Sequence, residues 1–287
     1  MPMRLRRSLR ALTLLAVGGC LVGGVAGAAE REDRGERSVA WQGLLGSRPA
    51  AQLTGRFIIV FNAPSLADRV KTAGGRASEK DQKRWTAAAE AAQDRLLARL
   101  AADGAGLAPE HRYVRVLNAI AAALDPRVLP VLEKRRFVAG VYPVRAAYPA
   151  AVSREGLPVD LDDQPRIAIP GKRGRDVEVA LLDTGVDLTH PYLVDRLLPG
   201  IDVVDPGGDA SARQNPTERG RAERHGTEMA GIAVGSGGPD GLRGIAPRAS
   251  LRPIRIAGWQ PDGAGGVSVY ARTDQLIAGL EAAVDPN

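Results

Sequence analysis

The sequence has almost no cysteine. Cys20 is the only one in 287 residues, and it lies in a segment typical of an export signal, so we expect the mature chain to have none. Disulfide bonds and a thiol nucleophile are therefore excluded for the mature chain. Histidine and acidic residues show no zinc-ligand spacing, so no metal-binding residue is predicted.

Aromatic residues are also scarce, at 4% of the chain. Arginine is abundant, but it is spread through the N-terminal segment, a predicted helix and predicted strands, which argues against nucleic-acid binding. Residues 1–150 contain 24 lysines and arginines against 13 acidic residues, whereas residues 151–287 contain 15 against 20. These opposite net charges favour docking of one half of the chain on the other.

The first 29 residues are typical of a signal peptide. Arginines come first, an apolar stretch follows at 11–29, and Ala26-Gly27-Ala28 offers the small residues that precede a cleavage site. We expect a mature chain that starts near Ala29, a secreted or cell-envelope location, and membrane contact only through this signal. Two alternatives stay open: an uncleaved membrane anchor, and a lipoprotein with its lipid on Cys20.

Residues 30–52 are charged and rich in turn-forming residues, which predicts a flexible lead-in. Residues 53–150 then follow the order strand, helix, strand, strand, helix, strand, which is typical of a small ferredoxin-like α+β domain. Alternating or β-branched runs predict the strands, and apolar spacing and a cap at Asp125-Pro126 predict the helices. The predicted elements are 56–61, 79–102, 111–117, 118–123, 127–134 and 137–144.

Residues 151–176 contain prolines and glycines among charged residues and no apolar period, which predicts a linker. After it, strands are predicted at 177–182 and 250–256, and helices from His225 and at 269–284. Alternating strands and helices argue for a parallel sheet covered on both faces. We therefore expect an α/β domain at 177–287.

Two residues of this domain are candidate catalytic groups. Asp183 ends a buried apolar strand, where a carboxylate is costly unless it has a partner. His225 stands at the start of a predicted helix, followed by Gly226, which lets the backbone and a substrate approach closely. These residue types act together where a carboxylate orients a histidine that serves as general base.

Residues 183–187 (DTGVD) resemble the aspartate motif of the subtilase family of serine peptidases, and residues 225–231 (HGTEMAG) resemble its histidine motif. Residues 244–247 (GIAP) are similar to the segment that leads into the next sheet strand of that family. The resemblance implies a three-layer parallel-sheet domain that hydrolyses a polypeptide substrate through an Asp-His-Ser triad. Aspartic peptidases also use Asp-Thr-Gly, but they need two copies, and this sequence has one.

The resemblance also bears on substrate and metal binding. Gly263, Ala264 and Gly265 stand where the family has a glycine-rich edge that pairs with an extended substrate; a glycine-rich turn is the alternative. No cofactor is required. Structural calcium is frequent in the family, but Tyr192 stands where relatives place a ligating carboxylate, so the sequence does not support that site.

Residues 56–145 resemble the inhibitor-I9-like propeptide of family precursors, which assists folding and then blocks the active site of its own chain. The tail at 144–151 would lie in the substrate cleft, and maturation would occur between that tail and Asp176. The propeptide is therefore the expected intramolecular partner.

The family's nucleophile lies in a Gly-Thr-Ser-Met/Leu-Ala motif, and no such motif follows His225. Ser236, Ser250 and Ser268 are not on a helix-start turn of that kind. We therefore expect a C-terminally incomplete precursor that is inactive as a peptidase by itself. The alternative hypothesis is a non-catalytic protein that acts as a propeptide-type inhibitor or folding chaperone for a related peptidase.

Overall fold

The computed structural model describes residues 51, 53, 55–148, 173–238, 241 and 243–285. The expected signal peptide, nearly all of the lead-in and most of the linker lie outside these residues. Within the described part of the chain, no helix has the length and apolar character needed to cross a membrane.

The N-terminal unit, residues 55–148, is built on a four-stranded antiparallel sheet with the order β2-β3-β1-β4. The predicted strand at 56–61 and the predicted helix at 79–102 are confirmed with the same bounds. Helix α2 was not predicted; it begins with a capping box, in which Ser65 and Asp68 each accept a backbone N–H of the other. The elements are β1 (Arg56–Phe61), α2 (Leu66–Thr72), α3 (Glu79–Ala102), β2 (Pro109–Tyr113), β3 (Ala119–Ala123), the 3-10 helix η1 (Pro126–Val128), α4 (Leu129–Glu133) and β4 (Val138–Pro143).

The C-terminal unit, residues 173–285, contains a parallel sheet with the order β6-β8-β7. A second, antiparallel sheet has the order β5-β10-β9, and its strand β5 comes from the end of the N-terminal unit. The elements are β5 (Ala146–Ala147), β6 (Glu178–Asp183), β7 (Ile201–Asp202), α5 (His225–Val234), β8 (Ser250–Arg255), β9 (Ala257–Pro261), β10 (Val267–Arg272) and α6 (Thr273–Ala283).

The predicted helix at 269–284 is wrong over its first four residues, which belong to β10. Arg272 is extended, with φ −91° and ψ 148°, and the Gln275 side chain accepts its backbone N–H, so the helix begins at Thr273. Alternating side chains in the run VSVYAR favour a strand. Strand β9, which was not predicted, pairs with β10 and completes the hairpin.

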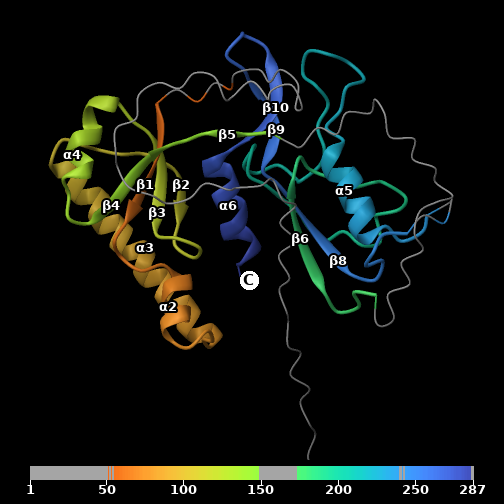
Figure 1. Ribbon diagram of the computed structural model, residues 1–287, viewed down its shortest axis with the longest axis horizontal. Coiled ribbons are helices and arrows are strands. Elements are labelled where there is room, and N and C mark those ends of the chain that lie inside the picture. Colours follow the sequence, from red (N-terminus) through yellow and green to blue (C-terminus); the bar gives the residue numbers. More distant parts are fainter. Residues whose placement is uncertain are drawn as a thin grey trace, which may run out of the picture.

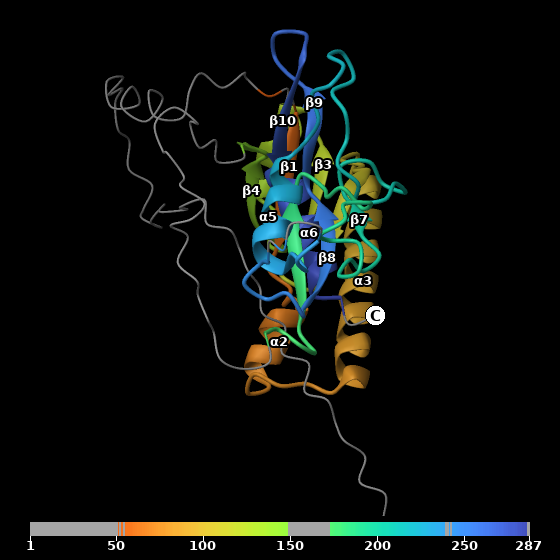
Figure 2. The same cartoon turned by 90° about the vertical axis from the view of Figure 1, so that its right-hand side faces the viewer.

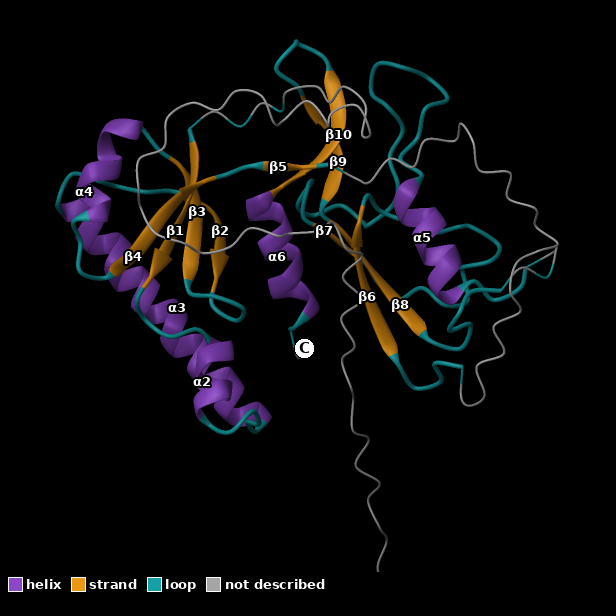
Figure 3. Ribbon diagram, viewed as in Figure 1, coloured by secondary structure: helices purple, strands orange, loops and turns teal. Residues whose placement is uncertain are grey.

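Helix α6 lies between the two main sheets, as Figures 1 and 2 show. Ile277 and Ala278 pack with apolar residues of β1, β2 and β3, while Leu276 packs with those of β6 and β8. The opposite face of the first sheet packs against α3, and the opposite face of the parallel sheet packs against α5 (Figure 3). The parallel sheet is therefore covered by helices on both faces, as the alternating sequence pattern predicts.

Candidate active site

Asp183 and His225 lie in direct contact. The Nδ1 atom of His225 is 2.8 Å from Oδ1 and 2.9 Å from Oδ2 of Asp183. Asp183 is 8% exposed, whereas His225 is half-buried at the start of α5. A buried carboxylate on Nδ1 fixes the tautomer and orientation of an imidazole ring and stabilises its protonated form.

The backbone around both residues is fixed by further hydrogen bonds. The Thr184 N–H donates to Asp183 Oδ1 (2.7 Å), and the Gly226 N–H donates to Thr184 Oγ1 (3.0 Å). A Cβ on Gly226 would overlap the carbonyl oxygen of Gly185, so only glycine allows α5 to approach the end of β6 this closely. Residues 183–185 and 225–227 are therefore held against each other by a hydrogen bond and by close backbone packing.

The hydrogen bond with Asp183 raises the pKa of His225 above its ordinary value of 6.5, although burial of the ring acts in the opposite direction. Glu228, one turn further along α5, adds to the rise. Within the described residues, Nε2 of His225 has no hydrogen-bond partner. The ring can therefore accept a proton through Nε2 while Asp183 stabilises the charge at Nδ1.

None of the three serines considered above contacts His225 in the described structure. The Ser236 hydroxyl donates to the Tyr192 carbonyl (3.0 Å), Ser250 begins β8, and the Ser268 hydroxyl is buried in β10 without a hydrogen-bond partner. Among the described residues, none of these three hydroxyls is paired with His225.

Gly263, Ala264 and Gly265 lie in the turn that joins β9 to β10. The Asp262 carboxylate accepts the backbone N–H groups of Ala264 (3.0 Å) and Gly266 (2.8 Å). These residues form no extended edge; the strand edge that pairs with another segment is that of β10, against β5. Their conformation is that of the glycine-rich turn given above as the alternative, and a role of these three residues in substrate binding stays a prediction.

A pocket with a volume of about 600 Å³ opens beside the N-terminus of α5. Its lining includes Thr227, Glu228 and Asp187, and the Thr227 hydroxyl accepts the Asp187 N–H (2.9 Å). The Asp187 carboxylate accepts from Thr189 N (2.9 Å) and Oγ1 (2.7 Å), and these bonds lower the pKa of Asp187. The lining also includes Arg224, which precedes His225 in the sequence.

Tyr192 occupies the position where the family resemblance would place a calcium-ligating carboxylate. The Tyr192 ring packs against the His190 ring, with 5.3 Å between centroids, and joins the apolar cluster beneath α5. Hard cations prefer carboxylate and carbonyl oxygens, and this side chain offers neither. Among the described residues, no group of three or more histidine, cysteine or acidic side chains is placed to hold a metal.

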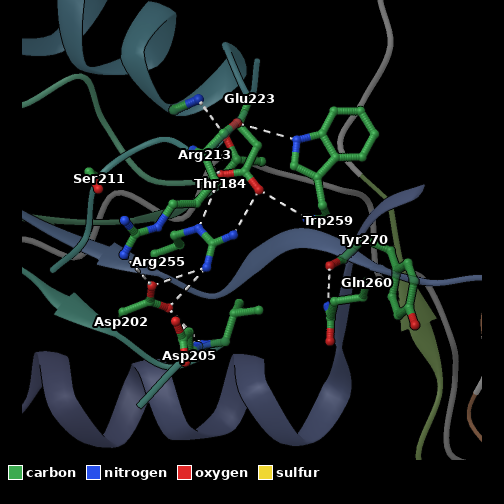
Figure 4. Close-up of polar contacts among 12 residues, drawn as sticks. Thr184, Asp202, Asp205, Ser211, Arg213, Glu223, Arg255, Trp259, Gln260 and Tyr270 are labelled. Atoms are coloured by element: carbon green, nitrogen blue, oxygen red, sulfur yellow. Dashed lines mark hydrogen bonds and ion pairs between the residues drawn. The ribbon is translucent and has the colours of Figure 1, made fainter. Parts of the chain in front are cut away.

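Sequence reasoning missed a cluster of buried charges around Arg255, which Figure 4 shows. Arg255 ends β8 and forms ion pairs with Asp202 and Glu223, and all three side chains are at most 4% exposed. The available signal was an arginine between two isoleucines in a buried strand, since an arginine is almost never buried without acidic partners.

Carboxylate-oriented histidine general bases define a class of hydrolases. Residues 174–275 match the family model Peptidase_S8, described as the subtilase family. The chain is 31% identical over 190 residues to the minor extracellular protease Vpr of Bacillus subtilis (strain 168), covering 60% of this chain and 22% of that protein. It is 30% identical over 181 residues to subtilisin E of the same strain, covering 61% and 41% respectively.

Two solved structures of related proteins match parts of this chain. The serine protease of Aeromonas sobria is 36% identical over 29% of this chain and 13% of that chain, with a TM-score of 0.24. Fervidolysin from Fervidobacterium pennivorans is 19% identical over 80% of this chain and 34% of that chain, with a TM-score of 0.40. The chain spans less than half the length of the curated relatives described above. The family match and the curated relatives show that residues 174–275 are similar to the subtilase family.

Proposed function

We propose that this chain is the N-terminal part of an exported subtilisin-like serine endopeptidase precursor. The observation that carries the proposal is the Asp183–His225 pair, with both carboxylate oxygens within 2.9 Å of Nδ1. In the proposed reaction, Nε2 of His225 takes the proton of a serine hydroxyl as its oxygen attacks the peptide carbonyl. The same nitrogen then returns that proton to the leaving amine, and a water molecule later releases the acyl group.

We further propose that residues 53–150 are a ferredoxin-like propeptide. The strand order β2-β3-β1-β4 and the alternation of strands and helices support this fold. Its tail adds an edge strand to the C-terminal unit, because β5 pairs antiparallel with β10, with Ala147 opposite Ala271. A tail bound in this way would occupy the edge that an extended substrate would use.

Helix α6 supplies the other contacts of this proposed inhibitory complex. The Glu281 carboxylate accepts the backbone N–H groups of Val114, Arg115 and Val116, with the shortest distances at 3.0, 2.9 and 2.6 Å. The Tyr113 hydroxyl donates to the Asp274 carbonyl (2.9 Å). Polar groups this well satisfied at a buried contact favour one defined docking geometry.

To test this proposal, the reading frame is followed beyond Asn287 to its stop codon and the encoded protein is expressed. The protein is then treated with a fluorophosphonate probe, which labels activated serines. We expect labelling, and processing between residues 151 and 176. Asp183→Asn should lower the labelling rate by about four orders of magnitude, whereas Glu178→Gln, at the other end of the same strand, should leave it unchanged. An extended protein with no Gly-Thr-Ser motif and no labelling would overturn the proposal.

The alternative, a non-catalytic inhibitor or chaperone, draws on the same β5–β10 contact. It predicts that the 287-residue chain, added at micromolar concentration, slows hydrolysis of a chromogenic peptide by subtilisin E. Unchanged hydrolysis would count against this alternative and leave the endopeptidase proposal standing.

A further inference from the structure

The buried charge cluster connects β8 to the chain that leads into α5. Arg255 Nε and Nη2 donate to Oε2 (3.1 Å) and Oε1 (2.8 Å) of Glu223, and Nη1 donates to both carboxylate oxygens of Asp202 (3.1 Å each). The Arg255 side chain is 4% exposed, and both carboxylates are fully buried. The planar guanidinium makes a two-nitrogen forked contact with Glu223, which fixes the direction of this partner as well as its distance.

Glu223 is also anchored by the backbone on both sides. Its carboxylate accepts the N–H groups of Arg213 and Trp259, each at 2.9 Å, and its own N–H donates to the Arg213 carbonyl (2.9 Å). Glu223 therefore closes the base of the 213–223 loop, two residues before His225 (Figure 4).

The end of β8 holds both members of the catalytic pair. In the parallel β6–β8 ladder, Asp183 lies opposite Arg255, and the next N–H, that of Ile256, donates to the Asp183 carbonyl (2.9 Å). The same strand end thus fixes the backbone of Asp183 directly and the approach to His225 through Arg255 and Glu223.

We propose that Arg255 and Glu223 are positioning residues, which hold the segment before α5 so that the His225 ring stays in contact with the Asp183 carboxylate. This inference rests on the proposed function, because positioning matters for catalysis only if the pair acts as a general base. Gly258 leaves the space that the Arg255–Glu223 contact needs. A Cβ at this position would overlap the Arg255 guanidinium and lie 2.8 Å from Glu223 Oε1.

The experiment measures the imidazole pKa of His225 by NMR in the 287-residue chain, which contains only two other histidines. Gly258→Ala displaces the guanidinium without changing any charge, and Arg255→Lys keeps the charge but loses the fork. The matched control is Arg252→Lys, since Arg252 pairs with Glu178 (2.7 Å) on the same two strands away from the site. Amide spectra verify that each variant is folded.

We expect the pKa of His225 to fall toward 6.5 in Gly258→Ala and Arg255→Lys and to stay raised in the control. A raised pKa that persists in both folded variants would overturn the inference. Charge effects are separated by Glu223→Gln and Arg255→Gln, which remove opposite charges. If Arg255 and Glu223 position the histidine, the pKa of His225 should fall in both variants. If they act only through their charge, the pKa of His225 should fall in Glu223→Gln and rise in Arg255→Gln, which would count against positioning.

Asp183→Asn separates this inference from the proposed function. If the pKa of His225 stays raised in that variant, Asp183 does not stabilise the protonated histidine, and the proposed function is wrong as well. If Asp183→Asn lowers the pKa but the Gly258 and Arg255 variants do not, the positioning inference alone is wrong.

Discussion

The two main sheets of this molecule bury different kinds of side chain. The antiparallel sheet of the N-terminal unit covers an apolar core, in which Ile59, Leu100 and Ile120 have no exposed surface. The parallel sheet also has apolar faces, but its carboxyl end buries Asp183, Asp202 and Arg255, whose exposure is 8%, 5% and 3% when the whole residue, backbone included, is counted.

Sheet topology explains this difference. The carboxyl ends of parallel strands meet at one edge, so residues that end β6, β7 and β8 converge there. Buried charges persist only when they are paired, because their desolvation is costly. The first sheet is therefore stabilised mainly by apolar packing, whereas the second combines apolar packing with an edge of buried, paired charges.

The largest expected effect comes from breaking the charged edge. Arg255→Met leaves the Asp202 and Glu223 carboxylates buried without their main cation, so we expect a loss of about 3–5 kcal/mol in the free energy of unfolding. Urea unfolding followed by fluorescence measures it. Arg252→Met removes a partly exposed pair and should cost less than about 1 kcal/mol; equal losses would contradict the comparison.

The apolar sheet should respond to loss of volume instead. Leu100→Ala removes a fully buried side chain from the contact between α3 and the first sheet, and we expect a loss of about 3 kcal/mol in the free energy of unfolding. Val131→Ala, at a position 42% exposed, is the control and should cost less than about 1 kcal/mol. The raised pKa of His225 should not change in either variant; a change would show that the two units are not independent.

Removing the contact between the units should have a smaller effect. Glu281→Gln replaces a carboxylate that accepts three backbone N–H groups, and we expect docking to weaken by about 1–3 kcal/mol. Limited proteolysis of the N-terminal unit should become faster. Glu178→Gln lies outside this contact and should leave the cleavage rate unchanged; equal rates in both variants would argue against the role of Glu281.

The smallest expected effect is a pH dependence of opposite sign in the two units. The hydrogen bond to Asp183 raises the pKa of His225. Protonated His225 therefore adds to the free energy of unfolding below about pH 6.5, and this addition is lost as pH rises through the pKa of His225 in the folded protein. Burial and the nearby Arg272 lower the pKa of His111, whereas Asp274 and Glu110 act in the opposite direction. Neutral His111 therefore adds to the free energy of unfolding above about pH 6.5, and this addition is lost as pH falls.

NMR titration measures both midpoints, and we expect them on opposite sides of pH 6.5. His111→Gln should remove the acid-side loss of stability only, and His225→Gln the loss at higher pH only. Two midpoints on the same side would contradict the environments described for these rings.

Local patterns in the sequence were sufficient for several elements. Residues 56–61 and 79–102 form the strand and helix that their composition predicts, because β-branched content and apolar spacing act within a few turns of chain. The start of α6 was misplaced, since residues 267–271 pair with β9, and Arg272 pairs with Ala146 of β5, which is distant in the sequence. Strand pairing is a tertiary contact, and it overrode the helical pattern.

The sequence by itself was sufficient to predict that Asp183 and His225 act as a pair, because a carboxylate at the end of an apolar strand and a histidine at a helix start are local features. Only the tertiary structure decided what holds that pair. Arg255, Glu223 and Asp202 come from three separate segments, and their burial follows from the meeting of strand ends at one edge of the sheet. Parallel pairing and desolvation, which no local pattern encodes, made this cluster.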